Sequence, residues 1–157
     1  MSLETKHDLN ESTVSKLQEL IRLNIDSYDG FHSSADDLKD PQLATLFREI
    51  AQERSHLATE LQEYVEWNGE AAVEDGSYLA AFHRTWIDLR SKLSGGDSYA
   101  VLAEAERGED HIKHAYEDVL KSTAGSAMND VLMCQYKTVK LGHDRIRDLR
   151  DAYKARS

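Results

Sequence analysis

The chain has 157 residues, of which 40% are hydrophobic and 31% charged, a composition typical of one globular domain and not of a disordered chain. Its net charge of −10 disfavours contact with nucleic acid or with an anionic membrane surface, so we expect neither as a partner. The single cysteine, Cys134, excludes an intrachain disulfide, and no stretch of the sequence resembles a secretory leader or a membrane span. We therefore expect one domain, residues 1–157, in the cytoplasm.

Apolar residues recur along the chain at spacings of three and four, which is the period of an amphipathic helix. Alternating β-branched runs are lacking, and the helical pattern is interrupted only at short stretches rich in Gly, Asp or Asn and at the single proline, Pro41. The sequence therefore predicts five helices, over residues 12–38, 41–68, 78–93, 98–122 and 127–154.

The connections between these helices predict how the bundle is assembled. Asp40 is a suitable N-cap for the second helix, and Pro41 takes its first position, where a missing N–H costs nothing. The first two and the last two long helices are joined by tight turns, so each pair forms an antiparallel hairpin. The segment over 69–97 is long enough to cross the full bundle height and contains the short helix. This order predicts an all-α four-helix bundle whose second and third long helices are parallel.

Each apolar stripe is broken near its middle by a polar residue. Counted from the hairpin turns, these residues fall at similar heights, so we expect one polar layer across an apolar core. The glycine at position 142 lies just beyond the layer and is interpreted as a packing residue, which allows either close approach of two helices or room for a bulky tyrosine. The predicted layer consists of Asn24, Arg54, Glu109 and Gln135.

Glu109 stands where the helical period calls for Leu or Ala, and a buried carboxylate without a partner costs several kcal/mol. Arg54 is one candidate partner, because a guanidinium can hold a carboxylate through two parallel hydrogen bonds. Asn24 and Gln135 would then satisfy the remaining polar atoms. On this interpretation, which we favour, the layer fixes helix register and the protein is not an enzyme.

A bound metal is the alternative partner for Glu109. Glu53 and His56 form a Glu-x-x-His motif, which supplies ligands to di-iron and di-manganese centres in four-helix bundles, and Glu106 lies one turn before Glu109. The first helix offers no core-facing acid, however, the last has no Glu-x-x-His, and an inward Arg54 would place its charge where the ion must bind. We expect no cofactor on the favoured interpretation, and iron or manganese on the alternative, held by Glu53, His56, Glu106 and Glu109.

Several short motifs are shared with one known group of proteins: Asn24 with Asp29-Gly30, Glu53-Arg54 with Glu60-Leu61, Arg107-Gly108-Glu109-Asp110 with Tyr116, and Gly76-Ser77 followed by His83-Arg84-x-Trp86. With these motifs, over about residues 13–150, the chain resembles a bacterial ferritin-like family of four-helix bundles that is a domain of unknown function. The resemblance implies a ferritin-like fold and assigns no activity. It leaves a structural, interaction or stress-related role as our expectation.

Classical ferritins are similar in fewer positions. The Glu53 to His56 segment is similar to their ligand segment on the second helix, Glu109 to their glutamate on the third, and Gln135 to their glutamine on the fourth. The glutamate of their first helix has no core-facing equivalent here, which argues against iron oxidation.

Aromatic residues in and around the crossover need a surface to cover them. We expect Trp67, Trp86 and Tyr99 to pack within the monomer, and a homodimer contact is the alternative.

Overall fold

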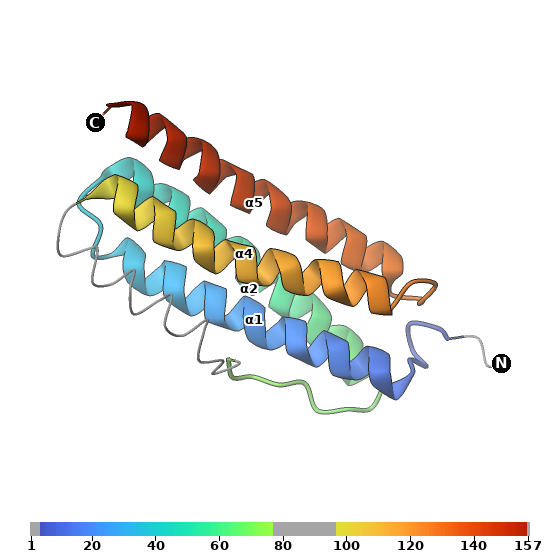
Figure 1. Cartoon of the computed structure of the whole chain (residues 1–157). Coiled ribbons are helices and arrows are strands. Elements are labelled where there is room, and N and C mark those ends of the chain that lie inside the picture. Colours follow the sequence, from blue (N-terminus) through green and yellow to red (C-terminus); the bar gives the residue numbers. More distant parts are fainter. Residues whose placement is uncertain (1–3, 77–96, 157) are drawn as a thin grey trace.

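The computed structural model describes residues 4–76 and 97–156, and this part of the chain forms four long helices (Figure 1). This confirms the prediction of an all-α bundle. The expected short helix at 78–93, with Trp86, lies outside the described residues. None of the described helices is long and apolar enough to cross a membrane. The helices are α1 (Glu11–Ala35), α2 (Pro41–Trp67), α4 (Ser98–Ser122) and α5 (Asn129–Arg156).

The helices pack as two antiparallel hairpins, α1 with α2 and α4 with α5, as predicted. Contacts between α1 and α4 and between α2 and α5 join the hairpins into one bundle. Figure 1 shows that α2 and α4 run in the same direction, opposite to α1 and α5. Neighbouring helices are therefore antiparallel, and the helices that face each other diagonally are parallel.

The crossover begins by turning back along the first hairpin, as the green segment in Figure 1 shows. Gln18 of α1 holds it through two hydrogen bonds, donating to the Ala71 carbonyl at 2.8 Å and accepting from the Val73 amide at 2.9 Å. Gln62 of α2 donates to the Val73 carbonyl at 2.9 Å. The chain thus leaves α2 toward the end of the bundle at which α4 begins, which is the direction a parallel α4 requires.

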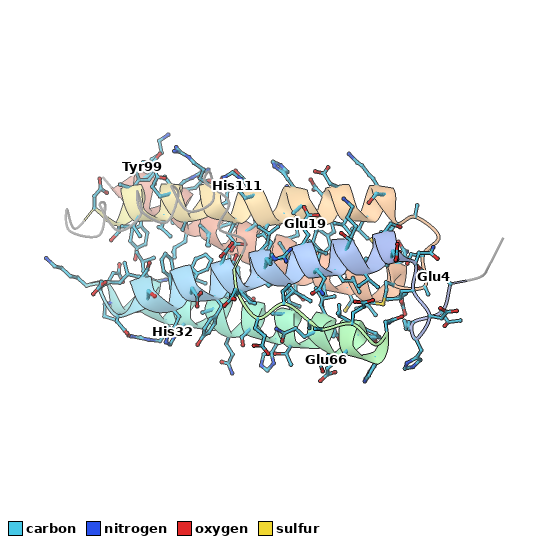
Figure 2. All side chains as sticks on the ribbon, turned by 90° about the horizontal axis from the view of Figure 1, so that it is seen from below. Glu4, Glu19, His32, Glu66, Tyr99 and His111 are labelled. Carbon is cyan, nitrogen blue, oxygen red and sulfur yellow. The ribbon has the colours of Figure 1, made fainter. Side chains whose placement is uncertain are left out.

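The segment before α1 links the two hairpins at the other end of the bundle. The Glu4 carboxylate accepts hydrogen bonds from the Ser126 hydroxyl and from the Ala127 amide, the latter at 3.0 Å, and Figure 2 shows Glu4 beside the α4–α5 turn. The Asn68 side chain, just after α2, accepts from the Leu9 amide at 2.8 Å. These bonds anchor the start of the chain to both hairpins.

Two apolar clusters fill the bundle, one toward each end, and the side chains meet between the helices (Figure 2). Every helix contributes apolar side chains to both clusters. Between the clusters, the apolar stripe of each helix is interrupted by a polar or small residue. The first cluster includes Leu17, Ile21, Leu61, Ile112, Leu132 and Val139. The second includes Phe31, Leu43, Phe47, Ile50, Leu102 and Ile146. Between them lie Asn24 on α1, Arg54 on α2, Glu109 on α4 and Gly142 on α5.

Side-chain caps define where α2 and α4 begin. Asp40 accepts hydrogen bonds from the Gln42 and Leu43 amides at 2.9 and 3.5 Å, and its second oxygen accepts from the Tyr153 hydroxyl of α5. Asp97 caps α4 by accepting from an amide of its first turn at 3.2 Å. The predicted N-cap of α2 is thus also a contact between the two hairpins.

We expect D40A to lower the free energy of unfolding by about 1–2 kcal/mol, because the substitution removes a helix cap and a partner of Tyr153. N10A is the matched control, since Asn10 precedes α1 but its side chain makes no capping hydrogen bond. N10A should change stability by less than about 0.5 kcal/mol. Urea denaturation of the three proteins measures both values, and equal losses would contradict the assigned role of Asp40.

Candidate functional site

An ion pair lies at the centre of the bundle between the two apolar clusters. Arg54 of α2 donates from Nη2 to Oε2 of Glu109 on α4, and both side chains are 0% exposed. Arg54 points inward because it continues the buried stripe of Ile50 and Leu57 at helical spacing. Glu109 points inward for the same reason, since it lies between Ala105 and Ile112 on the buried stripe of α4. The pair therefore connects two helices that face each other diagonally across the core.

The pair is electrically balanced but incompletely hydrogen-bonded. Burial raises the pKa of the Glu109 carboxyl above its usual value, and the Arg54 guanidinium opposes that rise through its charge and its hydrogen bond. Among the described residues, no hydrogen-bond partner is present for Nε and Nη1 of Arg54 or for Oε1 of Glu109. Since desolvation of two charges is only partly offset, the pair is a constraint on the fold more than a source of stability.

Gly142 of α5 provides the space that Arg54 occupies. A Cβ atom at this position would lie 2.9 Å from Nη2 of Arg54, closer than real Cβ contacts. The packing role predicted for this glycine was close helix approach or room for a tyrosine, whereas in the structure it makes room for the guanidinium. The sequence reasoning missed this role because the two residues lie on helices far apart in the chain.

A second polar group lies beside the ion pair and connects all four helices. Asn24 of α1 donates to the Tyr116 hydroxyl of α4 at 2.9 Å, and this hydroxyl donates to Oε1 of Gln135 on α5 at 2.7 Å. The Gln135 amide donates to the Glu60 carboxylate of α2 at 2.6 Å and to the Leu57 carbonyl at 3.3 Å. Burial raises the pKa of Tyr116, so its hydroxyl keeps its proton and remains a donor.

The four predicted layer residues are all buried, and Arg54 pairs with Glu109 as predicted, but the partners of Asn24 and Gln135 differ from those predicted. Asn24 and Gln135 were expected to complete the hydrogen bonding of the ion pair, whereas both bond to Tyr116. The polar layer predicted from the sequence did not include Tyr116. The signal that could have revealed its role is chemical, because a buried tyrosine hydroxyl usually finds a hydrogen-bond partner.

The Glu-x-x-His residues of α2 lie on the flanks of the helix instead of in the core. With Arg54 pointing inward, Glu53 is half-buried and its Oε1 lies 3.9 Å from Nη1 of Arg145 on α5. His56 is exposed. One inward position per helical turn accounts for this arrangement, because Arg54 takes the position that a ligand from this motif would need.

The two candidate ligands of α4 face different partners. Glu109 bonds to Arg54 in the core, and Glu106 pairs with Arg150 of α5 nearer the surface. Glu53, His56, Glu106 and Glu109 therefore do not form one ligand set in the described structure. Among residues 4–76 and 97–156, the group of possible ligands that does come together contains Glu106, Asp110 and His143, of which only Glu106 was in the predicted set.

Fold and site together define a four-helix bundle with a buried Arg-Glu pair and a tyrosine-centred hydrogen-bond chain. Residues 12–122 match the model of the family described as a domain of unknown function, DUF2383, and the chain belongs to this family. The match includes Arg54, Glu109 and Tyr116 and ends before α5 with Gln135 and Gly142. No curated protein matches the chain.

We expect E109A to lower the free energy of unfolding by about 3–5 kcal/mol, since it leaves the Arg54 charge buried without a partner. E109Q should cost less, because its amide oxygen can still accept a hydrogen bond. The matched comparison for the arginine is R54A against R48A, since Arg48 forms an exposed ion pair with Asp36 at 3.3 Å. R48A should cost no more than about 1 kcal/mol. Denaturant unfolding of all four variants tests this, and a negligible loss in E109A would contradict the buried pair.

A methyl group at position 142 should have opposite effects in two backgrounds. In the wild type, G142A should destabilise by about 1–3 kcal/mol, because the added Cβ displaces the Arg54 guanidinium. In R54A/E109A the same change should stabilise by up to ~1 kcal/mol, since alanine is the better helix former and the guanidinium is gone. A thermodynamic cycle from urea denaturation measures the difference, and equal effects in both backgrounds would refute the proposed fit.

Proposed function

We propose that the protein is a non-enzymatic ferritin-like helical bundle, a structural or interaction module in which a buried ion pair occupies the middle of the core. The ferritin-like assignment is supported by the helix directions, with two antiparallel hairpins and a crossover that makes α2 and α4 parallel. A cytoplasmic location remains our proposal from composition, as does a stress-related role. The acidic surface, with a net charge of −10, favours protein partners without an acidic binding face.

The position of Arg54 carries the non-enzymatic part of the proposal. Four-helix bundles that use metal build the centre in the core, from carboxylates and histidines that project inward from facing helices. Here the inward side chain of α2 is the permanently charged guanidinium of Arg54, and the carboxylate it faces, Glu109, is already neutralised by it. A metal ion at this point would meet a fixed positive charge in a water-excluded core, which repels it strongly.

Large apolar side chains on the described surface support an interaction role. Trp67 at the end of α2 is 51% exposed, and Leu141 on α5 is 64% exposed. Trp67 contacts the rings of His7 and Tyr64, but these contacts cover only part of its side chain. A homodimer or a protein partner would remove these surfaces from water, and sedimentation analysis over a range of protein concentrations distinguishes the two.

The test compares the wild type with E53Q and H56A after aerobic Fe(II) loading of protein purified without chelator. We expect no Fe(II) oxidation above the buffer rate and no metal whose binding depends on Glu53 or His56, because both lie outside the core. About two irons per chain, lost in both variants, would contradict the proposal and would support a di-iron centre. Elemental analysis and the absorbance of oxidised iron provide the two measurements.

A further inference from the structure

A second group of ionisable side chains lies on the flank of the α4–α5 hairpin, separate from the polar layer. Glu106 and Asp110 are one turn apart on α4 and face His143 of α5. One ligand atom from each residue can be chosen so that all three lie within 4.8 Å of one another. We call Glu106, Asp110 and His143 the flank cluster.

The histidine of the flank cluster is held in a fixed orientation. His143 is 6% exposed, and its Nε2 lies 2.6 Å from Oδ1 of Asp110. Its Nδ1 lies 3.2 Å from Oδ1 of Asp144, which is outside the cluster. In metal sites a carboxylate on the far ring nitrogen fixes the imidazole and makes its other nitrogen a better ligand. Asp144 stands in this position relative to the Nε2 that faces Asp110.

Glu106 completes a ligand set that is shielded but not closed to solvent. Its side chain is 15% exposed, whereas that of Asp110 is 44% exposed. Two carboxylates and one imidazole suit a divalent transition metal such as Zn²⁺, with bonds of about 2.0–2.2 Å. Ligand atoms around such an ion are about 3–3.5 Å apart, so side-chain movements of about 1 Å would bring the cluster into coordination. The exposed side leaves room for a water ligand.

We propose that Glu106, Asp110 and His143 form a binding site for one Zn²⁺-class ion that clamps α4 to α5. The site shares no residue with the polar layer, and Glu106 is its one residue from the ligand set that the sequence suggested for a ferritin-like centre. It therefore goes beyond the proposed function and is compatible with a non-enzymatic bundle. Its role is to strengthen the hairpin and to make its stability depend on metal.

Arg150 is the competitor for this site. Its Nη1 pairs with Glu106 and its Nη2 lies 3.0 Å from Asp151, so it neutralises Glu106 in the described structure. The Arg150 side chain is 27% exposed, and it can turn toward Asp151 and the solvent when an ion takes its place. Removing this guanidinium should therefore improve metal binding, an effect that a merely structural salt bridge would not produce.

The experiment titrates Zn²⁺ into metal-free full-length protein by calorimetry and repeats the titration with Co²⁺, whose absorption reports histidine and carboxylate ligation. We expect one ion per chain and an increase in Tm on Zn²⁺ addition. H143A and D110N should each weaken binding at least tenfold, and R150Q should strengthen it several-fold. D110N keeps the test valid if H143A fails to fold, because Asp110 is partly exposed.

H114A and H56A are the controls, since both histidines are exposed and lie on helices of the same bundle. Both should bind Zn²⁺ like the wild type. Absence of saturable binding, or equal affinity in wild type and D110N, would overturn the site, and an R150Q affinity no higher than wild type would overturn the place of Glu106 in it. Binding lost in H56A but kept in D110N would overturn both this site and the proposed function. The other outcomes overturn the site alone, so the two failures can be told apart.

Discussion

The pairing of Arg54 with Glu109 is the constraint around which the core is arranged. Two charges without solvent contact are tolerated only where each meets the other, so the helices that carry them have one acceptable register. A slip of α4 by one turn would bring Glu109 against one of the two apolar clusters, at a cost of several kcal/mol. The apolar clusters supply most of the driving force for folding, and the pair selects the alignment in which they form.

The tyrosine-centred hydrogen bonds complement that selection. The ion pair connects α2 with α4 only, whereas the chain from Asn24 through Tyr116 to Gln135 reaches α1 and α5 as well. The chain passes from the Asn24 amide through the Tyr116 hydroxyl to the Gln135 amide and ends at Glu60 near the surface. Because the chain ends at the edge of the bundle, its last carboxylate remains solvated, and the buried part of the chain carries no net charge.

Helical period and turn chemistry were sufficient to predict the hairpins, the cap at Asp40 and the burial of Glu109. These features depend on residues close in sequence or on one face of one helix. The partners of Asn24 and Gln135 were not predictable in this way, because a period gives the direction of a side chain and not its rotamer or the height of the opposite helix. The space that Gly142 leaves for Arg54 was not predictable for the same reason. The Glu-x-x-His spacing on α2 suggested metal ligands, but the apolar stripe through Ile50 and Leu57 predicted that Arg54 would point inward, as it does.

Glu106 and Glu109 lie one turn apart on α4 and show that the depth of a carboxylate in the bundle determines whether its arginine partner can be exchanged for a metal ion. Glu109 is in the core, and both it and its guanidinium partner Arg54 are 0% exposed. Glu106 is near the surface, and its partner Arg150 has both solvent and Asp151 to turn to. Exchange of an arginine for a metal ion requires that the displaced charge be rehydrated, so exchange is feasible for Glu106 and opposed for Glu109. The same helix can therefore carry a permanent internal pair and an exchangeable site at the flank.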